Sequence, residues 1–177
     1  MAESALIPLL PAEEHERRQR RDNSAVQSLW SLLDVVTDPE IPAVSLWELG
    51  VLQDVQVRGG VVVVTITPTY SGCPAMTVMA EDIVQALADA GYPDSEIITR
   101  LAPAWSTSWI SDEAQEKLRV YGIAPPGQGC DGGGADIHCP RCNSDNVRSI
   151  SDFGSTACKA LYQCSDCGEP FDYFKPI

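Results

Sequence analysis

Long apolar runs are missing from this 177-residue chain, and none approaches the roughly 20 residues that span a membrane. The apolar stretch at 6–11 is too short for the core of a signal peptide, and the arginines between 17 and 21 follow it instead of preceding it. We therefore expect a cytoplasmic protein with no membrane partner.

Clustered positive charge is also missing, because the net charge is −13. The arginines at 17, 18, 20 and 21 resemble a nucleic-acid-binding arm, but neighbouring acidic residues cancel them. Binding to a phosphate backbone requires a basic surface, so nucleic acid is not expected as a partner. The acidity is explained by solubility or by a basic protein partner.

Catalytic motifs are equally scarce. The only histidines are His15 and His138, and no pair of Glu-x-x-His motifs is present to build a di-iron carboxylate site. The chain has neither a Gly-x-Gly-x-x-Gly dinucleotide fingerprint nor a phosphate-binding P-loop. An oxygenase or a flavin reductase formed by this chain alone is therefore not expected, and we predict a non-catalytic component.

Cysteine, by contrast, is well represented. Four of the seven cysteines form two Cys-x-x-Cys pairs: Cys139, Cys142, Cys164 and Cys167. In a cytosolic chain this spacing favours metal over disulfides, because each pair presents two thiolates to one tetrahedral ion. We predict a structural zinc ion. Iron, as in rubredoxin, and two separate redox dithiols are the alternatives.

The segment around these cysteines is predicted to be a β-ribbon over residues 136–177. Strand-like stretches occur at 146–150, 160–163 and 171–174. About 42 residues bury too little apolar surface to fold alone, and structural zinc supplies on the order of 10 kcal/mol or more. Four protein ligands leave no open position on the metal, so this module supports folding and docking rather than turnover.

The preceding segment, 24–125, is predicted to be a small two-layer α+β domain. Its order is helix, strand, strand, helix, strand, helix, and a Gly59-Gly60 turn joins the first two strands. Ser24 and Gln27 fit a capping box at the first helix, and Ser111 begins the last one. Residues 1–23 are expected to be a flexible tail, and 126–135, which contains Cys130, a glycine-rich linker.

Cys73 is the candidate reactive thiol of this first domain. Pro74 suits the first position of the helix predicted over 74–90, which makes Cys73 its N-cap, where unpaired N–H groups favour a thiolate. Cys73 is thus either an iron or cluster ligand or a small buried apolar residue. Asp38 and Glu40 add carboxylates in a proline-stiffened loop, as oxygen ligands or as solvated charges after a helix.

These residues carry a resemblance. The segments 38–42, Leu49-Gly50 and 71–74 resemble the metal–sulfur cluster assembly family, whose members act in iron–sulfur maturation. The segment 104–110, the glycine-rich linker and the stretches 153–156 and 158–162 narrow it to the PaaD (PaaJ) family of the bacterial phenylacetyl-CoA epoxidase system. The resemblance covers residues 24–177.

The resemblance implies an accessory role in the maturation of an epoxidase. That epoxidase consists of a di-iron oxygenase and an iron–sulfur flavin reductase, and either of them is an expected partner of this chain. It places the reactive-cysteine role on Cys73 and the acidic-loop role on Asp38 and Glu40, with iron or an iron–sulfur cluster as transient cargo. A stable structural subunit is the alternative. Cys158 is expected to be a packing residue, with a second transfer thiol as the other option. One cysteine offers too few ligands for a cluster, so a homodimer or a glutathione-like ligand is expected to complete it.

Overall fold

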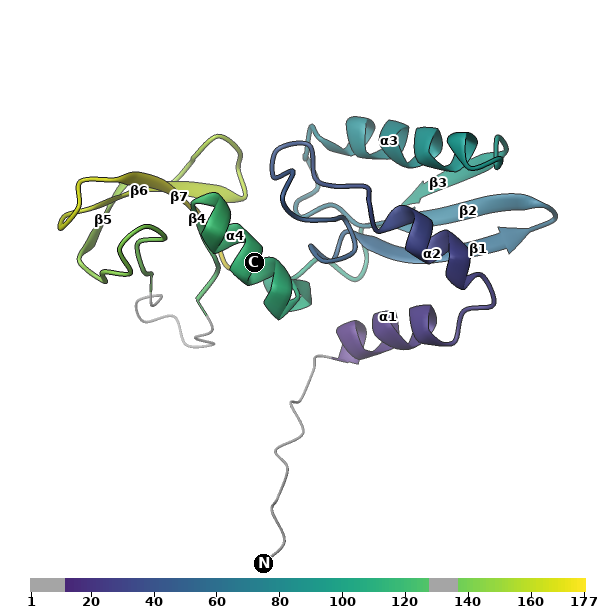
Figure 1. Ribbon diagram of the computed structural model, residues 1–177, viewed down its shortest axis with the longest axis horizontal. Helices are drawn as coiled ribbons and strands as arrows, with labels where there is room; N and C mark the ends of the chain where they lie inside the picture. Colours follow the sequence, from purple (N-terminus) through teal and green to yellow (C-terminus); the bar gives the residue numbers. More distant parts are fainter. Residues whose placement is uncertain (1–11, 128–136) are drawn as a thin grey trace, which may run out of the picture.

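The structure is a computed structural model that describes residues 12–127 and 137–177. It contains a three-stranded sheet with helices beside it and a four-stranded sheet toward the C-terminus (Figure 1). This confirms the expected α+β fold class. Cys130, most of the expected linker and the start of the expected tail lie outside the described residues. Within the described ranges, no helix is both long enough and apolar enough to cross a membrane.

The first sheet is built on the predicted hairpin. Strands β1 (Leu52–Arg58) and β2 (Val61–Ile66) pair antiparallel, and β3 (Ser95–Thr99) joins β2 in parallel, so the sheet is mixed. Gly59 and Gly60 connect β1 to β2 with φ angles of +58° and +88°, which glycine adopts without a steric cost.

Helices α2 (Gln27–Leu33) and α3 (Met76–Asp89) contribute their buried faces to one apolar core with the sheet. The predicted capping box at the start of α2 does not form. Val26 is the N-cap, with no side-chain hydrogen bond, and the Gln27 amide instead donates to two backbone carbonyl oxygens of the preceding segment. The core helices are therefore held by packing more than by capping.

The expected flexible tail is wrong for residues 12–22, which form helix α1 (Ala12–Asp22) against β1 and α2. Figure 1 shows α1 lying alongside α2. The helix is polar, yet Glu14 and Arg17 are buried in it. Charges that cancel in the sequence are here paired at helical spacing, which allows a segment without an apolar stripe to pack against the domain.

Helix α4 (Asp112–Tyr121) matches the last predicted helix. Ser111 is its N-cap and accepts the Ala114 N–H, and Gly122 ends it with a φ angle of +98°. The chain then forms β4 (Ile123–Ala124), which pairs in parallel with β7 (Pro170–Phe174). Residues assigned by sequence to the first domain thus supply a strand of the ribbon's sheet.

The ribbon contains the three predicted strands. Strand β6 (Lys159–Cys164) lies between β5 (Val147–Ser151) and β7, antiparallel to both, and the sheet order is β4-β7-β6-β5. Its own small core includes two of the metal-site cysteines and the aromatic rings of β7.

The ribbon packs directly on the first domain. Cys158 and Phe174 belong to the same core cluster as the helices of that domain. The rings of Trp105 and Phe174 lie with their centroids 5.8 Å apart, and the Thr107 N–H donates to the Ile177 carbonyl oxygen at 3.1 Å. Groups from both modules therefore meet at one interface.

Candidate functional site

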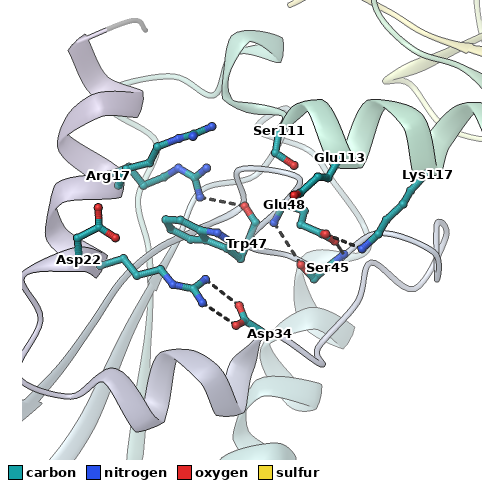
Figure 2. A pocket seen from close by; sticks show the side chains of 11 residues that line it. Arg17, Asp22, Asp34, Ser45, Trp47, Glu48, Ser111, Glu113 and Lys117 are labelled. Carbon is teal, nitrogen blue, oxygen red and sulfur yellow. Dashed lines mark hydrogen bonds and ion pairs between the residues drawn. The ribbon is translucent and has the colours of Figure 1, made fainter.

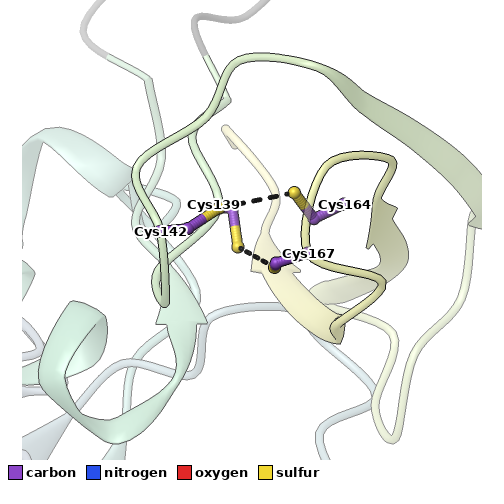
Figure 3. Close-up of side chains that lie close together, drawn as sticks. All are labelled: Cys139, Cys142, Cys164 and Cys167. Atoms are coloured by element: carbon purple, nitrogen blue, oxygen red, sulfur yellow. Dashed lines mark hydrogen bonds between the residues drawn. The ribbon is translucent and has the colours of Figure 1, made fainter.

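The four ribbon cysteines converge as the sequence predicted. Their sulfur atoms all lie within 4.8 Å of one another. The Cys139 and Cys167 sulfurs are 3.7 Å apart, and those of Cys142 and Cys164 are 3.6 Å apart (Figure 3). Tetrahedral zinc with bonds of about 2.3 Å requires sulfur separations of about 3.8 Å. The residues therefore fit a four-thiolate metal ion.

The electrostatics of the cluster also favour a cation. Backbone N–H groups of Cys167 and Asp166 lower the pKa of Cys164 to about 7. At Cys142 the Ser144 N–H favours the thiolate, but the neighbouring thiols outweigh it and raise the pKa to about 12. Four sulfurs this close cannot all ionise without a positive ion between them. A bound metal ion would supply that charge and would join the two Cys-x-x-Cys turns.

Side-chain hydrogen bonds and an ion pair also join the two Cys-x-x-Cys turns. The Asp166 carboxylate accepts from Ser144 and from the Asn146 amide, the latter at 2.8 Å, and Arg141 pairs with Glu169 at 2.7 Å. These bonds connect the two ligand turns outside the sulfur atoms. All four ligands come from the protein, so the site has the form of a structural site.

Cys73 lies in the turn before α3 and is half-buried, but it is not the N-cap. That position belongs to Ala75, whose N–H bonds to the Cys73 thiol. Burial raises the pKa of Cys73, and the charges of Cys158, Asp38 and Glu40 raise it further, against the effect of the Ala75 N–H. The surroundings of Cys73 in the structure thus favour the protonated thiol and not the predicted thiolate.

Asp38 occupies a tight turn rather than a helix end, because α2 already ends at Leu33. Its Oδ1 accepts the N–H groups of Glu40 at 2.8 Å and Ile41 at 2.9 Å. The side chain is only 6% exposed, and burial raises its pKa despite these two bonds. The structure thus brings a buried carboxylate close enough to Cys73 to affect that thiol's pKa.

The ribbon contributes two further groups to this region. Cys158 is 8% exposed, with its sulfur 3.1 Å from the Thr156 hydroxyl, and burial raises its pKa. The adjacent Lys159 has a side chain only 4% exposed, with its ammonium 3.9 Å from Glu40 and 3.8 Å from Asp172. Sequence reasoning missed Lys159, since no motif marks a lysine as buried.

The sulfur and carboxylate groups of this region do not form a ready-made metal cage. In the described ranges, the ribbon cysteines are the only group of three or more metal-binding side chains with all ligand atoms within 4.8 Å of one another. The region around Cys73 is instead an interface between the two modules that gathers two thiols, two carboxylates and a buried cation.

A second polar region that the sequence did not predict surrounds Arg17 (Figure 2). Its guanidinium donates to both oxygens of Glu14 at 2.7 and 3.0 Å and stacks 3.9 Å from the centre of the Trp47 ring. It also donates to three backbone carbonyl oxygens, those of Trp47, Leu52 and Trp109. The Glu14–Arg17 spacing is the sequence signal that predicts the pair.

The hollow beside it, of about 610 Å³, is lined by groups of both signs, including Arg21, Asp34 and Lys117. Arg21 pairs with Asp34, and Lys117 pairs with Glu48. A lining with charges of both signs favours neither a positively nor a negatively charged ligand. We interpret this region as the anchor of α1.

Comparison with known proteins connects these features. Residues 124–175 match the PaaD zinc beta ribbon domain, and residues 27–97 match the iron–sulfur cluster assembly protein family. An Escherichia coli (strain K12) protein, provisionally named as one of the subunits of 1,2-phenylacetyl-CoA epoxidase, is 46% identical over 86% of this chain and 93% of its own length. The chain belongs to the PaaD family. The resemblance recognised in the sequence is thereby confirmed.

Two further comparisons each cover about half of this PaaD-family chain. A Porphyromonas gingivalis (strain ATCC BAA-308 / W83) protein, named Fe-S protein maturation auxiliary factor, is 35% identical over 49% of this chain and 84% of that protein. The crystal structure of a domain of unknown function from Bacillus anthracis matches with a TM-score of 0.48 and 25% identity, over 59% of this chain and 95% of that one.

Proposed function

We propose that this chain is an accessory maturation factor for the phenylacetyl-CoA 1,2-epoxidase of aerobic phenylacetate degradation, and that it assists insertion of iron or an iron–sulfur cluster. Membership of the PaaD family and the relation to an Fe-S protein maturation auxiliary factor support an accessory role connected with iron–sulfur proteins. Its clients are the oxygenase or the iron–sulfur flavin reductase of that system, in the cytoplasm. The chain performs no oxidation itself.

The placement of Cys73 carries this proposal. Its thiol lies half-buried at the start of α3, next to the carboxylates of Asp38 and Glu40. Metal that binds this thiol has to displace its proton, so loading and release of cargo at Cys73 depend on pH. The ribbon cysteines serve a different purpose, since they bind a structural zinc ion with no open position.

The proposal is tested by producing the epoxidase oxygenase and reductase components in cells with wild-type protein, Cys73→Ser or Cys130→Ser, and measuring their iron content. We expect Cys73→Ser to leave the clients iron-poor, while the Cys130→Ser control matches wild type. Fully loaded clients in cells that carry Cys73→Ser contradict the role of Cys73.

A stable structural subunit is the second candidate, favoured by the naming of the Escherichia coli relative as a component of the epoxidase. It predicts that the chain co-migrates with the oxygenase or reductase on size exclusion at micromolar concentration, and that Cys73→Ser changes nothing. Separate elution, combined with iron-poor clients in its absence, decides for the maturation factor.

A further inference from the structure

Cys158 lies in the core where the ribbon meets the first domain, but polar and charged groups are also near its thiol. Its sulfur contacts the Thr156 hydroxyl at 3.1 Å, and the next residue is the buried Lys159. The charges of Asp38 and Glu40 both act on its thiol. Cys158 therefore has apolar neighbours in the core and also lies within electrostatic reach of a lysine and two carboxylates.

Cys73 and Cys158 both lie where the ribbon packs on the first domain. Cys158 is part of the main core cluster, and Cys73 packs against that cluster from the other module. The ammonium of Lys159 lies 3.9 Å from Glu40, so the ribbon segment that carries Cys158 is held against the loop that carries Asp38. Cys158 acts electrostatically on the Cys73 thiol, and the carboxylates of Asp38 and Glu40 act on both thiols.

Burying this many ionisable groups is costly. Asp38 and the Lys159 side chain are 6% and 4% exposed, and the lysine's ion pairs are long, at 3.8 and 3.9 Å. Taking such groups out of water is unfavourable unless close partners compensate. Perturbed and buried ionisable groups of this kind cluster at functional sites.

We propose that Cys158 supplies the second thiolate ligand for the cargo bound at Cys73, so that the ribbon completes the cargo site of the first domain. This inference rests on the proposed function and replaces the expectation that a second copy of the chain or a glutathione-like molecule provides the missing sulfur. Thiolate and carboxylate donors together suit ferrous iron. Binding releases a proton from each thiol as its sulfur bonds to the metal, and no oxidation or reduction occurs.

The separation of the donors fits a carrier. These groups do not all lie within 4.8 Å of one another, as the ribbon cysteines do, so the donors have to draw together to hold cargo and can separate again to release it. Gly72, next to Cys73, leaves the turn room to adjust, since a Cβ there meets only the Tyr70 ring, at 3.6 Å. The site therefore has one adaptable ligand and one fixed in the core.

The test titrates the full-length, zinc-loaded protein anaerobically with Fe(II), following iron by competition with a coloured chelator and zinc in the same samples. We expect one Fe(II) per chain in wild type and in the Cys130→Ser control. Cys73→Ser and Cys158→Ser should each weaken binding tenfold or more, with the double variant little worse than either single one because both act on one site.

The outcomes separate the two claims. If Cys158→Ser binds Fe(II) as tightly as wild type while Cys73→Ser does not, the role of Cys158 is overturned and the proposed function is retained. If the wild-type protein binds no Fe(II) other than at the zinc site, both the inference about Cys158 and the proposed function are overturned. One iron per two chains assigns the second sulfur to a second copy and also overturns the inference.

A measurement on wild-type protein covers the case in which Cys158→Ser loses its fold or its zinc. The iron X-ray absorption fine structure of the Fe(II)-loaded chain counts the sulfur neighbours of the iron. Two sulfurs at one iron per chain are expected. A single sulfur contradicts the inference whatever the variants do.

Discussion

Replacing Arg17 with alanine should detach helix α1 from the protein. The side chain joins α1 to the rest of the molecule through three backbone carbonyl oxygens at 2.9 to 3.3 Å and through the Trp47 ring. It also neutralises Glu14, whose side chain is fully buried. The helix itself has no apolar stripe that could hold it in place without these contacts.

The magnitude follows from the contacts that are lost. Removing one partner of a buried ion pair costs roughly 3–5 kcal/mol, because the other charge stays buried. Arg18 also donates to Glu14, at 2.7 Å, which places the expected cost toward the lower end of that range. An isolated helix of 11 residues is marginal in water, so α1 should undock and unfold before the remaining domain does.

Trypsin provides the assay, since Arg17, Arg18, Arg20 and Arg21 all lie in α1. The docked helix resists cleavage, and Arg17→Ala should be cut at the remaining arginines at least tenfold faster. Arg20→Ala is the matched control: it also removes one trypsin site, but the Arg20 side chain is 32% exposed, and its contacts, with Glu16 at 3.9 Å and with the Gln53 carbonyl oxygen at 3.5 Å, are long. Equal cleavage rates for the two variants refute the anchoring role of Arg17.

Three further predictions concern the two cysteine sites. Cys142→Ser should lose the ribbon metal and lower the unfolding temperature, as measured by zinc content and calorimetry, because one thiolate of four is gone. Alkylation of Cys73 by iodoacetamide should be slower at pH 7 than that of a model thiol and should rise up to and beyond pH 9, because burial raises the pKa of Cys73. Equal rates at pH 7 contradict that burial effect. Asp38→Asn should unfold at the same or a higher temperature than wild type at pH 7, while client loading falls. Burial raises the pKa of Asp38, so its stabilising contribution is complete below about pH 3.9 and is lost as the pH rises through its folded pKa.

Much of the fold could be predicted because its signals are local. The Gly59-Gly60 turn, the Ser111 N-cap and the spacing of the ribbon cysteines each depend on neighbouring residues, and the structure confirms all three. Helix α1 was missed for the opposite reason. Its stability comes from an ion pair and from carbonyl oxygens supplied by residues 30 to 92 positions away, which no local pattern reveals.

In the candidate site, too, some features could be predicted from local sequence and others depend on long-range packing. Sequence and resemblance pointed to Cys73, Asp38 and Glu40, but the thiolate predicted for Cys73 ignored burial, which only the packed interface determines. Lys159 and the surroundings of Cys158 were likewise hidden, because they arise where the ribbon packs on the first domain. Long-range packing, rather than chemistry within a motif, limits what the sequence predicts.

The central claim is that this chain loads its client with iron through Cys73. The most direct measurement incubates purified, iron-loaded chain with iron-depleted oxygenase or reductase and follows client iron content and epoxidation together. The account predicts that wild type and Cys130→Ser restore both and that Cys73→Ser restores neither. Restoration by Cys73→Ser, or epoxidase activity regained without any gain of client iron, contradicts it.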